Sequence, residues 1–528
     1  MKNCMLKINN VKVRIKEKNY ARIISQLLNI RLSQIGEVKL LKRSIDARRK
    51  EVHYLCSFAF EYKGNEQLLK EKSKIPLIPY LKKEYLVQKA AHQDQVIVVG
   101  SGPAGLFCAL NLAKAGLKPI LIERGKDVDS RQKDIEKFWQ KGILNPSSNV
   151  QFGEGGAGTF SDGKLTTNIK DFRKEYILAE FVKAGAPKDI LYEAKAHIGT
   201  DYLRTVVKNM RQTIIDLGGS VMFETIFVDF KVKNNHIKSI LVKRDHKIYE
   251  LYCDHLVLAT GHSARDTYRL LHQRGVDMIR KPFSVGVRIE HLQSLINLNQ
   301  YHQADLDLKA ADYKLAYHTK DNRGVYTFCM CPGGYVVASS SEENGVVTNG
   351  MSEYARDGLN ANSAVLVSVL PTDFNNDDLF AGIKFQRDLE QKAFNITQKP
   401  YYAPVQLVED FLNDQMSKQF KEVKPTYLPG TTFAMFNEIF PSFVTNSLKE
   451  ALIDFERKIP GFISSNAVMT GVETRSSSPI KIMRDELFQT NIKGIYPIGE
   501  GAGASGGITT SAIDGIKCSE IIIEGKVR

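Results

Sequence analysis

The chain has 528 residues, of which 43% are hydrophobic and 25% are charged. This composition is that of an ordinary globular protein, and no apolar run approaches the roughly 18 residues that a membrane span needs. At roughly 150 residues per domain, we expect three or four domains. The first 18 residues carry scattered charges and no apolar core, which argues against a secretory signal or a lipid anchor, so we expect a cytoplasmic protein.

The net charge of +14 is concentrated at one end of the chain. Residues 1–90 contain 21 Lys and Arg against 8 Asp and Glu, an excess of 13 positive charges. The rest of the chain is almost balanced, as is typical of a metabolic enzyme. The leading segment is therefore suited to an acidic partner.

The seven cysteines are irregularly spaced and include no C-x-x-C pair, so we expect reduced thiols. Cys329 and Cys331 are the only close pair. We interpret them as buried strand residues, with a redox or metal role as the alternative, because zinc usually needs two such pairs or added histidines. No metal site is predicted.

The first 90 residues predict a small β-α-β-β domain. Apolar and polar residues alternate over 6–15, which indicates a strand. Helical spacing follows over 19–30, and two further strands are expected over 37–48 and 53–62. A proline-containing stretch and a polar run come next, so we place a boundary near residue 90.

The pattern then changes to that of a parallel α/β sheet. Residues 95–125 read as a buried strand, a glycine turn, a helix and a second buried strand. Residues 218–262 predict an antiparallel meander inserted before another buried strand. Mixed strand signals over 280–465 indicate a second, substrate-side domain, and the end of the chain is again strand, glycine loop and helix.

The pattern G-x-G-x-x-G occurs three times, beginning at Gly100, Gly153 and Gly501, so the pattern alone identifies nothing. A pyrophosphate site needs a turn after a buried strand, a glycine that lets the backbone approach, and a helix N-terminus. Only the first copy has all of these parts. It also has Glu123 at the end of the next strand, where a carboxylate binds the adenosine ribose and disfavours a 2′-phosphate.

The other two copies of the G-x-G-x-x-G pattern predict different roles. The copy at Gly153 follows a polar segment and precedes no helix, so its glycines suggest backbone lying against a planar or phosphorylated group; a merely flexible loop is the alternative. Thr159, Ser161 and Lys164 would supply polar contacts. The copy at Gly501 precedes a helix beginning near residue 508 and completes the site opened by the first, with Glu500 binding a polyol.

Seven segments together resemble the FAD-dependent oxidoreductases with a glutathione-reductase-like FAD domain, and most closely the bacterial FAD-dependent dehydrogenases of uncharacterised reaction. The segments are VVGSGPAGLFCAL, SNVQFGEGGAGTFSDGKL, LVLATGHSARDT, FSVGVRIEH, TFCMCPGGYV, TGVETRSSSP and YPIGEGAGASGGITTSA. The resemblance implies an α/β protein with a Rossmann-like FAD domain, an inserted mixed α+β substrate domain and the small N-terminal domain. The expected division is 1–90, 91–275 for the first part of the FAD domain, 276–467 for the substrate or cap domain, and 468–528 for the C-terminal part of the FAD domain.

The resemblance also implies non-covalent FAD and the residues that hold it, with the segment after the second strand running along the flavin. Glu500 stands where many such proteins carry aspartate. The implied cofactor-binding residues are Gly100, Ser101, Gly102, Pro103, Ala104, Gly105, Glu123, Arg124, Gly155, Gly156, Ala157, Thr159, Thr260, Gly261, Gly499, Glu500, Gly501, Ala502, Gly507 and Ile508.

The sequence departs from the pattern of such flavoproteins in two ways, and each limits how electrons could reach or leave the flavin. No C-x-x-x-x-C follows Glu123, so the chain is not expected to pass electrons through the dithiol of a disulfide reductase. No complete second Rossmann unit is visible over 280–465, so NADH or NADPH, if used, would visit the flavin transiently.

Four polar residues are candidates for catalysis: His262, Arg265, Lys164 and Arg475. An ordinary histidine with a pKa near 6.5 can donate or accept a proton, although a structural role for His262 is the alternative. For Arg475 the alternative is a salt bridge to Glu473 or Asp485. His197 is interpreted as structural or close to the cofactor.

The sequence is compatible with three functions. The favoured one is an FAD-dependent dehydrogenase or reductase acting on an unidentified small molecule. The second is an RNA-modifying flavoenzyme that uses the basic residues 1–90, for which binding would depend strongly on salt; the aromatics of that segment are expected in a strand core, which disfavours it. The third is a flavin-bound interaction protein without turnover.

Overall fold

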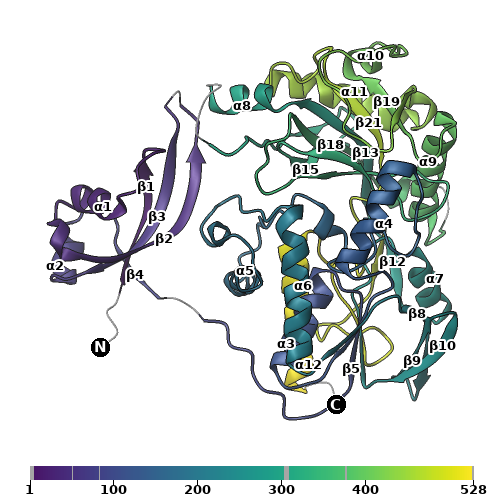
Figure 1. Ribbon diagram of the computed structural model, residues 1–528, viewed down its shortest axis with the longest axis horizontal. Coiled ribbons are helices and arrows are strands. Elements are labelled where there is room, and N and C mark those ends of the chain that lie inside the picture. Colours follow the sequence, from purple (N-terminus) through teal and green to yellow (C-terminus); the bar gives the residue numbers. More distant parts are fainter. Residues whose placement is uncertain (1–4, 50, 82–83, 303–307, 375–376, 526–528) are drawn as a thin grey trace.

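A computed structural model describes residues 5–49, 51–81, 84–302, 308–374 and 377–525 (Figure 1). Three sheets dominate it: one in the N-terminal domain, one parallel sheet and one large, mostly antiparallel sheet. This arrangement confirms the expected α/β fold with an inserted α+β domain. Among the helices described, none has both the length and the apolar content that crossing a bilayer requires.

The N-terminal domain is a four-stranded antiparallel sheet, ordered β2-β3-β1-β4, with two helices against one face. Its elements are β1 (Met5–Val13), α1 (Tyr20–Leu28), β2 (Ile35–Asp46), β3 (His53–Tyr62), α2 (Glu66–Lys72) and β4 (Ile78–Tyr80). Alternation buries Phe58 and Phe60 completely, as expected for a strand core. The predicted β-α-β-β order omitted α2 and β4. Pro79 lies inside β4, and a proline is tolerated there because β4 is an edge strand of the sheet.

The parallel sheet has the order β23-β11-β5-β6-β7 and lies between helices and a meander. Its strands are β5 (Val96–Val99), β6 (Ile120–Ile122), β7 (Ser220–Met222), β11 (His255–Leu258) and β23 (Ile495–Pro497). The predicted meander is β8 (Ile226–Lys233), β9 (His236–Arg244) and β10 (Lys247–Tyr252), and it covers one face. The associated helices are α3 (Pro103–Lys114), α4 (Val128–Lys141), α5 (Arg173–Lys183), α6 (Thr200–Asp216), α7 (Arg265–Gln273) and α12 (Ile508–Glu524).

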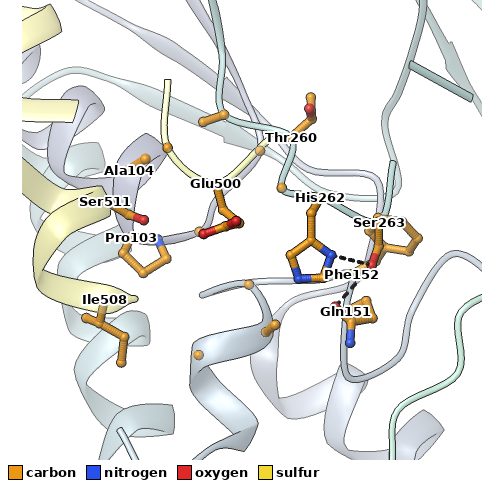
Figure 2. A pocket seen from close by; sticks show the side chains of 18 of the residues that line it. Pro103, Ala104, Gln151, Phe152, Thr260, His262, Ser263, Glu500, Ile508 and Ser511 are labelled. Carbon is orange, nitrogen blue, oxygen red and sulfur yellow. Dashed lines mark hydrogen bonds between the residues drawn. The ribbon is translucent and has the colours of Figure 1, made fainter. Parts of the chain in front are cut away.

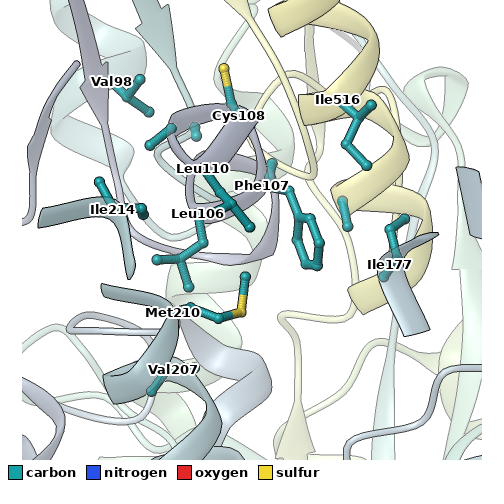
Figure 3. Close-up of a cluster of buried hydrophobic side chains, with 14 of the residues drawn as sticks. Val98, Leu106, Phe107, Cys108, Leu110, Ile177, Val207, Met210, Ile214 and Ile516 are labelled. Atoms are coloured by element: carbon teal, nitrogen blue, oxygen red, sulfur yellow. The ribbon is translucent and has the colours of Figure 1, made fainter. Parts of the chain in front are cut away.

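The α3 helix is the centre of the largest hydrophobic core (Figure 3). Leu106, Phe107 and Leu110 pack among side chains of the sheet, α5, α6 and α12. A Cβ atom on Gly515 would lie 2.1 Å from the carbonyl oxygen of Ala104, so glycine allows α3 and α12 to pack in close contact. Two helices from opposite ends of the FAD-domain sequence are thereby held side by side.

The second large sheet has seven strands in the order β14-β15-β18-β13-β21-β19-β20, and only the β19–β20 pair is parallel. Its strands are β13 (Phe283–Leu292), β14 (Ala316–His318), β15 (Gly324–Cys331), β18 (Asn360–Val369), β19 (Ala403–Leu407), β20 (Thr431–Phe433) and β21 (Val468–Glu473). Its helices are α8 (Gln293–Tyr301), α9 (Ala381–Thr397), α10 (Val408–Leu412) and α11 (Ser442–Lys458).

Two short ribbons complete the fold, namely β12 (Met278–Arg280) with β22 (Ile480–Ile482), and β16 (Tyr335–Ala338) with β17 (Thr348–Met351). β21 pairs with β13 inside the seven-stranded sheet, whereas the expected division put residue 468 in the FAD domain. We therefore propose that the C-terminal boundary of the substrate domain lies after Glu473. The other expected boundaries stay proposals.

Candidate cofactor and active site

A cavity of about 290 Å³ lies at the carboxyl ends of β5, β11 and β23, where they meet the large antiparallel sheet (Figure 2). The parallel strands place three backbone segments there, beginning at Gly100, Thr260 and Gly499. Ligands of open α/β sheets bind at this edge. The position therefore agrees with a nucleotide site.

The first glycine turn combines a left-handed residue with a close contact. Gly100 has φ +101°, a conformation that glycine adopts without strain. A Cβ on Gly105 would lie 1.9 Å from the carbonyl oxygen of Gly100, so this glycine permits α3 to approach β5. Gly102 is the N-cap of α3, and the N-terminus of this helix lines the cavity at Gly102, Pro103 and Ala104.

Glu123 links the turn to the loop that follows α4. One carboxylate oxygen accepts hydrogen bonds from the Ser101 amide at 2.9 Å and the Ser101 hydroxyl at 2.7 Å. The other accepts from the amides of Gly125 at 2.9 Å and Gly153 at 3.1 Å. The side chain also lines the cavity, so it is placed both to brace the site and to meet a ribose.

The second glycine stretch is held by a buried arginine that the sequence did not single out. Arg131 of α4 is fully buried and donates to the carbonyls of Asn149 at 2.8 Å, Val150 at 2.9 Å, Glu154 at 2.6 Å and Gly156 at 3.0 Å. The loop is consequently fixed, which excludes the flexible alternative. Gly156, Ala157 and Gly158 line the cavity, as expected for backbone lying against a planar group.

The C-terminal helix α12 places a second helix N-terminus at the cavity, at Gly507 and Ile508. Gly507 caps α12, and the Thr509 hydroxyl donates to the carbonyl oxygen of Leu165 at 2.9 Å, which ties this helix to the second glycine stretch. Burial raises the pKa of Glu500 to about 7, and its carboxyl accepts a hydrogen bond from the Ser478 amide at 3.2 Å. Glu500 lines the middle of the cavity.

The glycines around the cavity provide a test of whether a dinucleotide fits. A Cβ added to Gly261 would have no atom within 4 Å, one on Gly507 would meet only the Thr510 hydroxyl at 3.8 Å, and one on Gly102 only the Cα of Gly156 at 3.9 Å. Side chains at these three positions would thus project into open space beside the N-termini of α3 and α12. The residues present fit an anionic, flat and extended group such as FAD.

The large antiparallel sheet forms the opposite wall. Phe328, Cys329 and Glu473 of this sheet line the cavity, together with Asn349 of the neighbouring ribbon strand β17. Cys329 is exposed, whereas Cys331 is buried, so the expectation of two buried strand residues was wrong for Cys329, because a bulge in β15 turns its side chain out. Cys4 lies outside the described residues.

A buried arginine supports this wall. Arg288 donates to both carboxylate oxygens of Glu473, at 2.7 and 2.8 Å, to the carbonyl of Cys329 at 2.8 Å and to the side-chain oxygens of Asn349 and Asn362. Its contacts fix strands β13, β15, β17 and β21 relative to one another. The wall is therefore rigid.

Three of the four catalytic candidates line the cavity: His262, Lys164 and Arg475. The Lys164 ammonium contacts the Met330 carbonyl and lies 2.6 Å from a carboxylate oxygen of Asp162. Arg475 donates to both oxygens of Glu390, at 3.0 and 2.8 Å, so it is salt-bridged, but to a residue 85 positions earlier and not to the expected Glu473 or Asp485.

Arg265 and His197 lie outside the cavity lining. Arg265 is 3% exposed and binds Glu390 at 2.9 Å and Glu342 at 2.8 Å, so it holds α7 to α9. His197 is buried against Tyr354, and burial lowers its pKa to about 4. Both positions indicate structural roles.

Fifteen of the twenty implied cofactor residues line the cavity, and five do not. The five are Gly105, Gly155, Thr159, Gly501 and Ala502. Gly105 and Gly501 instead permit close backbone contacts, and the Thr159 side chain is buried. Sequence reasoning missed Gln151, Ser263, Arg131 and Arg288, for which no local motif exists because their partners are distant in the chain.

Comparisons with known proteins agree with this site. Residues 94–281 match the model of the pyridine nucleotide-disulphide oxidoreductase family, and residues 282–476 match that of the FAD-dependent protein, C-terminal domain-like family. An uncharacterised protein of Clostridium beijerinckii is 46% identical over 98% of each chain. The chain belongs to a family of FAD-dependent oxidoreductases. Residues 5–61 match a domain of unknown function, DUF8436.

Two solved structures resemble this oxidoreductase weakly. The flavin-dependent brominase Bmp2 has a TM-score of 0.38 at 13% identity, over 83% of this chain and 81% of that one. A geranylgeranyl bacteriochlorophyll reductase-like protein of Thermoplasma acidophilum has a TM-score of 0.36 at 13% identity, over 82% and 79%. At such values no activity is transferred from them.

Proposed function

We propose that this FAD-dependent oxidoreductase transfers hydride between its flavin and a small molecule held against the wall of the large sheet. Bound FAD supplies hydride-transfer chemistry, while the protein supplies orientation and charge. The observation that carries the proposal is that one cavity is lined both by the nucleotide turn at Gly100 and by Cys329 and Glu473 of the opposite wall. A substrate between them would contact both.

Two features of the chain support charge stabilisation in this space. The N-terminus of α12 reaches the cavity at Gly507 and Ile508, and a helix dipole stabilises negative charge by about 0.3 to 2 kcal/mol. Lys164 places an ammonium at the same cavity, held by Asp162. We propose that Lys164 binds the polar group of the substrate.

Anaerobic reduction of the purified protein tests this proposal. NADH, NADPH and a panel of small alcohols, amines and acids are added in turn, and the visible flavin absorbance is followed. We expect one class to bleach the flavin, with Lys164→Met slowing bleaching at least ten-fold while FAD affinity stays within two-fold. Lys170→Met, at an exposed neighbouring lysine, is the matched control. Equal rates in both variants would remove Lys164 from the reaction.

The RNA-modifying function is a second candidate, favoured by one observation. The excess of 13 positive charges over residues 1–90 coincides with a separate small domain. Phe58 and Phe60 are buried, so base stacking on them is excluded and binding would rest on phosphate contacts. The double substitution Lys39→Glu with Lys42→Glu should then abolish salt-dependent tRNA binding; unchanged binding would dismiss this candidate.

A further inference from the structure

A chain of hydrogen bonds runs from Ser339, just after β16, to His262 at the cavity. The amide nitrogen of Gln151 donates to the Ser339 hydroxyl at 2.6 Å and lies 3.4 Å from the Ser339 carbonyl oxygen. A carbonyl oxygen only accepts, so this end of the Gln151 side chain must be its NH2 group. The orientation of the amide is thereby fixed, and Oε1 is the end that faces Ser263.

The direction of each remaining bond follows from this orientation. The Ser263 hydroxyl oxygen lies 3.2 Å from Oε1 of Gln151 and 3.2 Å from Nδ1 of His262. An amide oxygen only accepts, so the single proton of Ser263 is donated to Gln151. The Ser263 oxygen can therefore only accept from His262, and Nδ1 of His262 must carry the hydrogen.

A neutral imidazole with hydrogen on Nδ1 has a lone pair on Nε2. The ring lines the cavity, and Nε2 lies on the edge turned away from Ser263 (Figure 2). The charged groups around the ring are Arg475, Arg265, Lys281 and the opposing Glu390. Burial and these guanidinium groups lower the pKa of His262 to about 3, so the ring stays neutral at physiological pH.

We propose that Gln151 and Ser263 are positioning residues that lock His262 as a permanent hydrogen-bond acceptor for a hydroxyl group of the bound dinucleotide. Figure 2 shows His262 between Glu500 and the segment carrying Gln151 and Phe152. Two oxygen- or nitrogen-centred acceptors, Glu500 and His262, thus line the middle of the cavity, where they match the hydroxyl groups of a sugar or ribityl chain. His262 is consequently a cofactor-binding residue and not a proton shuttle.

The inference rests on FAD as the cofactor and not on the identity of the substrate, so it can fail while the proposed hydride transfer stands. The inference also predicts that Gln151 controls the tautomer of His262. Gln151 is linked to His262 through Ser263, yet its replacement must change which nitrogen of His262 carries the hydrogen. A merely structural role of Gln151 has no such consequence.

The tautomer can be read directly from long-range proton–nitrogen NMR spectra of the FAD-bound protein labelled with 15N-histidine. His262→Gln identifies the His262 signals among the 11 histidines. We expect hydrogen on Nδ1 and a bare Nε2, unchanged between pH 5.5 and pH 8. A bare Nδ1, or a titration within this range, would overturn the proposal.

Variants of Gln151 test whether this residue determines the tautomer of His262. In Gln151→Leu, the freed Ser263 hydroxyl turns to donate to Nδ1, so the hydrogen moves to Nε2. Gln151→Glu keeps an acceptor for Ser263 and should preserve the wild-type tautomer. Gln212→Leu, at an exposed position on α6, is the matched control. An unchanged tautomer in Gln151→Leu would contradict the locking role.

FAD affinity provides the second readout. Loss of one net hydrogen bond of about 1 kcal/mol corresponds to about five-fold weaker binding, expected for Gln151→Leu and for His262→Phe. Gln151→Glu and Gln212→Leu should remain within two-fold. If Gln151→Leu moves the hydrogen but binds FAD as tightly as the wild type, FAD binding does not need Nε2 of His262 as an acceptor, and the proposal is overturned. Ser263→Ala, with Ser294→Ala as its exposed control, covers the case in which Gln151→Leu fails to fold.

Discussion

Glu500 is a buried carboxyl group that makes the stability of the FAD domain depend on pH. Burial raises its pKa from the ordinary 4.5 to about 7. The folded state therefore holds this proton more tightly than the unfolded state does, and stability is lost as pH rises from about 4.5 to about 7. The shift corresponds to about 3 kcal/mol.

We expect Glu500→Gln to remove this component in the protein stripped of FAD. Unfolding by urea at pH 5 and pH 8 should then show a pH dependence about 3 kcal/mol smaller than that of the wild type. Glu290, whose pKa burial also raises to about 7, keeps its own contribution in both proteins. Glu343→Gln, at an exposed glutamate, is the control, and an equal slope in both variants would show that Glu500 titrates normally.

At the scale of elements, Gly102 before α3 and Gly105 in the first turn of α3 have different roles. A Cβ on Gly102 would enter the cavity, whereas one on Gly105 would lie 1.9 Å from the Gly100 carbonyl oxygen. Gly102→Ala should therefore fold normally and bind FAD at least ten-fold more weakly. Gly105→Ala should unfold several degrees lower with or without FAD, because α3 must move from the sheet.

Thermal unfolding and FAD titration of the two variants separate these effects. Ser101→Ala is a useful third member, since Glu123 would lose one donor while the backbone is unchanged. The interpretation of the turn fails if Gly102→Ala binds FAD as the wild type does. It also fails if Gly105→Ala retains full stability.

The elements that the sequence predicted are those with local signals. A buried strand, a glycine turn and a helix lie within 20 residues of Gly100, and each part is recognised by its neighbours. The place of β21 in the large sheet was not predicted, because it depends on pairing with β13, about 180 residues earlier. Arg131 and the chain from Ser339 to His262 were missed for the same reason: their partners meet only in the folded protein.

At the scale of the whole molecule, Arg43 of β2 connects the N-terminal domain to the FAD domain by backbone hydrogen bonds. The Arg43 amide donates to the Tyr192 carbonyl at 2.7 Å, and the Ala194 amide donates to the Arg43 carbonyl at 2.8 Å. The guanidinium binds Glu193 at 3.0 Å and lies over the rings of Tyr54 and Tyr192. Sequence patterning predicted the domain but not this contact.

Loss of the Arg43 side chain should therefore loosen the domain without disturbing the cavity. Residues 84–90 lie outside helices and strands, with Leu86 78% exposed, and contain Lys89 as a trypsin site. If the arginine contributes about 1.4 kcal/mol, Arg43→Ala should raise the rate of cleavage at Lys89 about ten-fold, because cleavage follows the population of the open form. The flavin spectrum and FAD affinity should stay unchanged. Arg22→Ala, at an exposed arginine of α1, should cleave as the wild type does; cleavage of Arg43→Ala at that same rate would mean that the domain is held by other contacts.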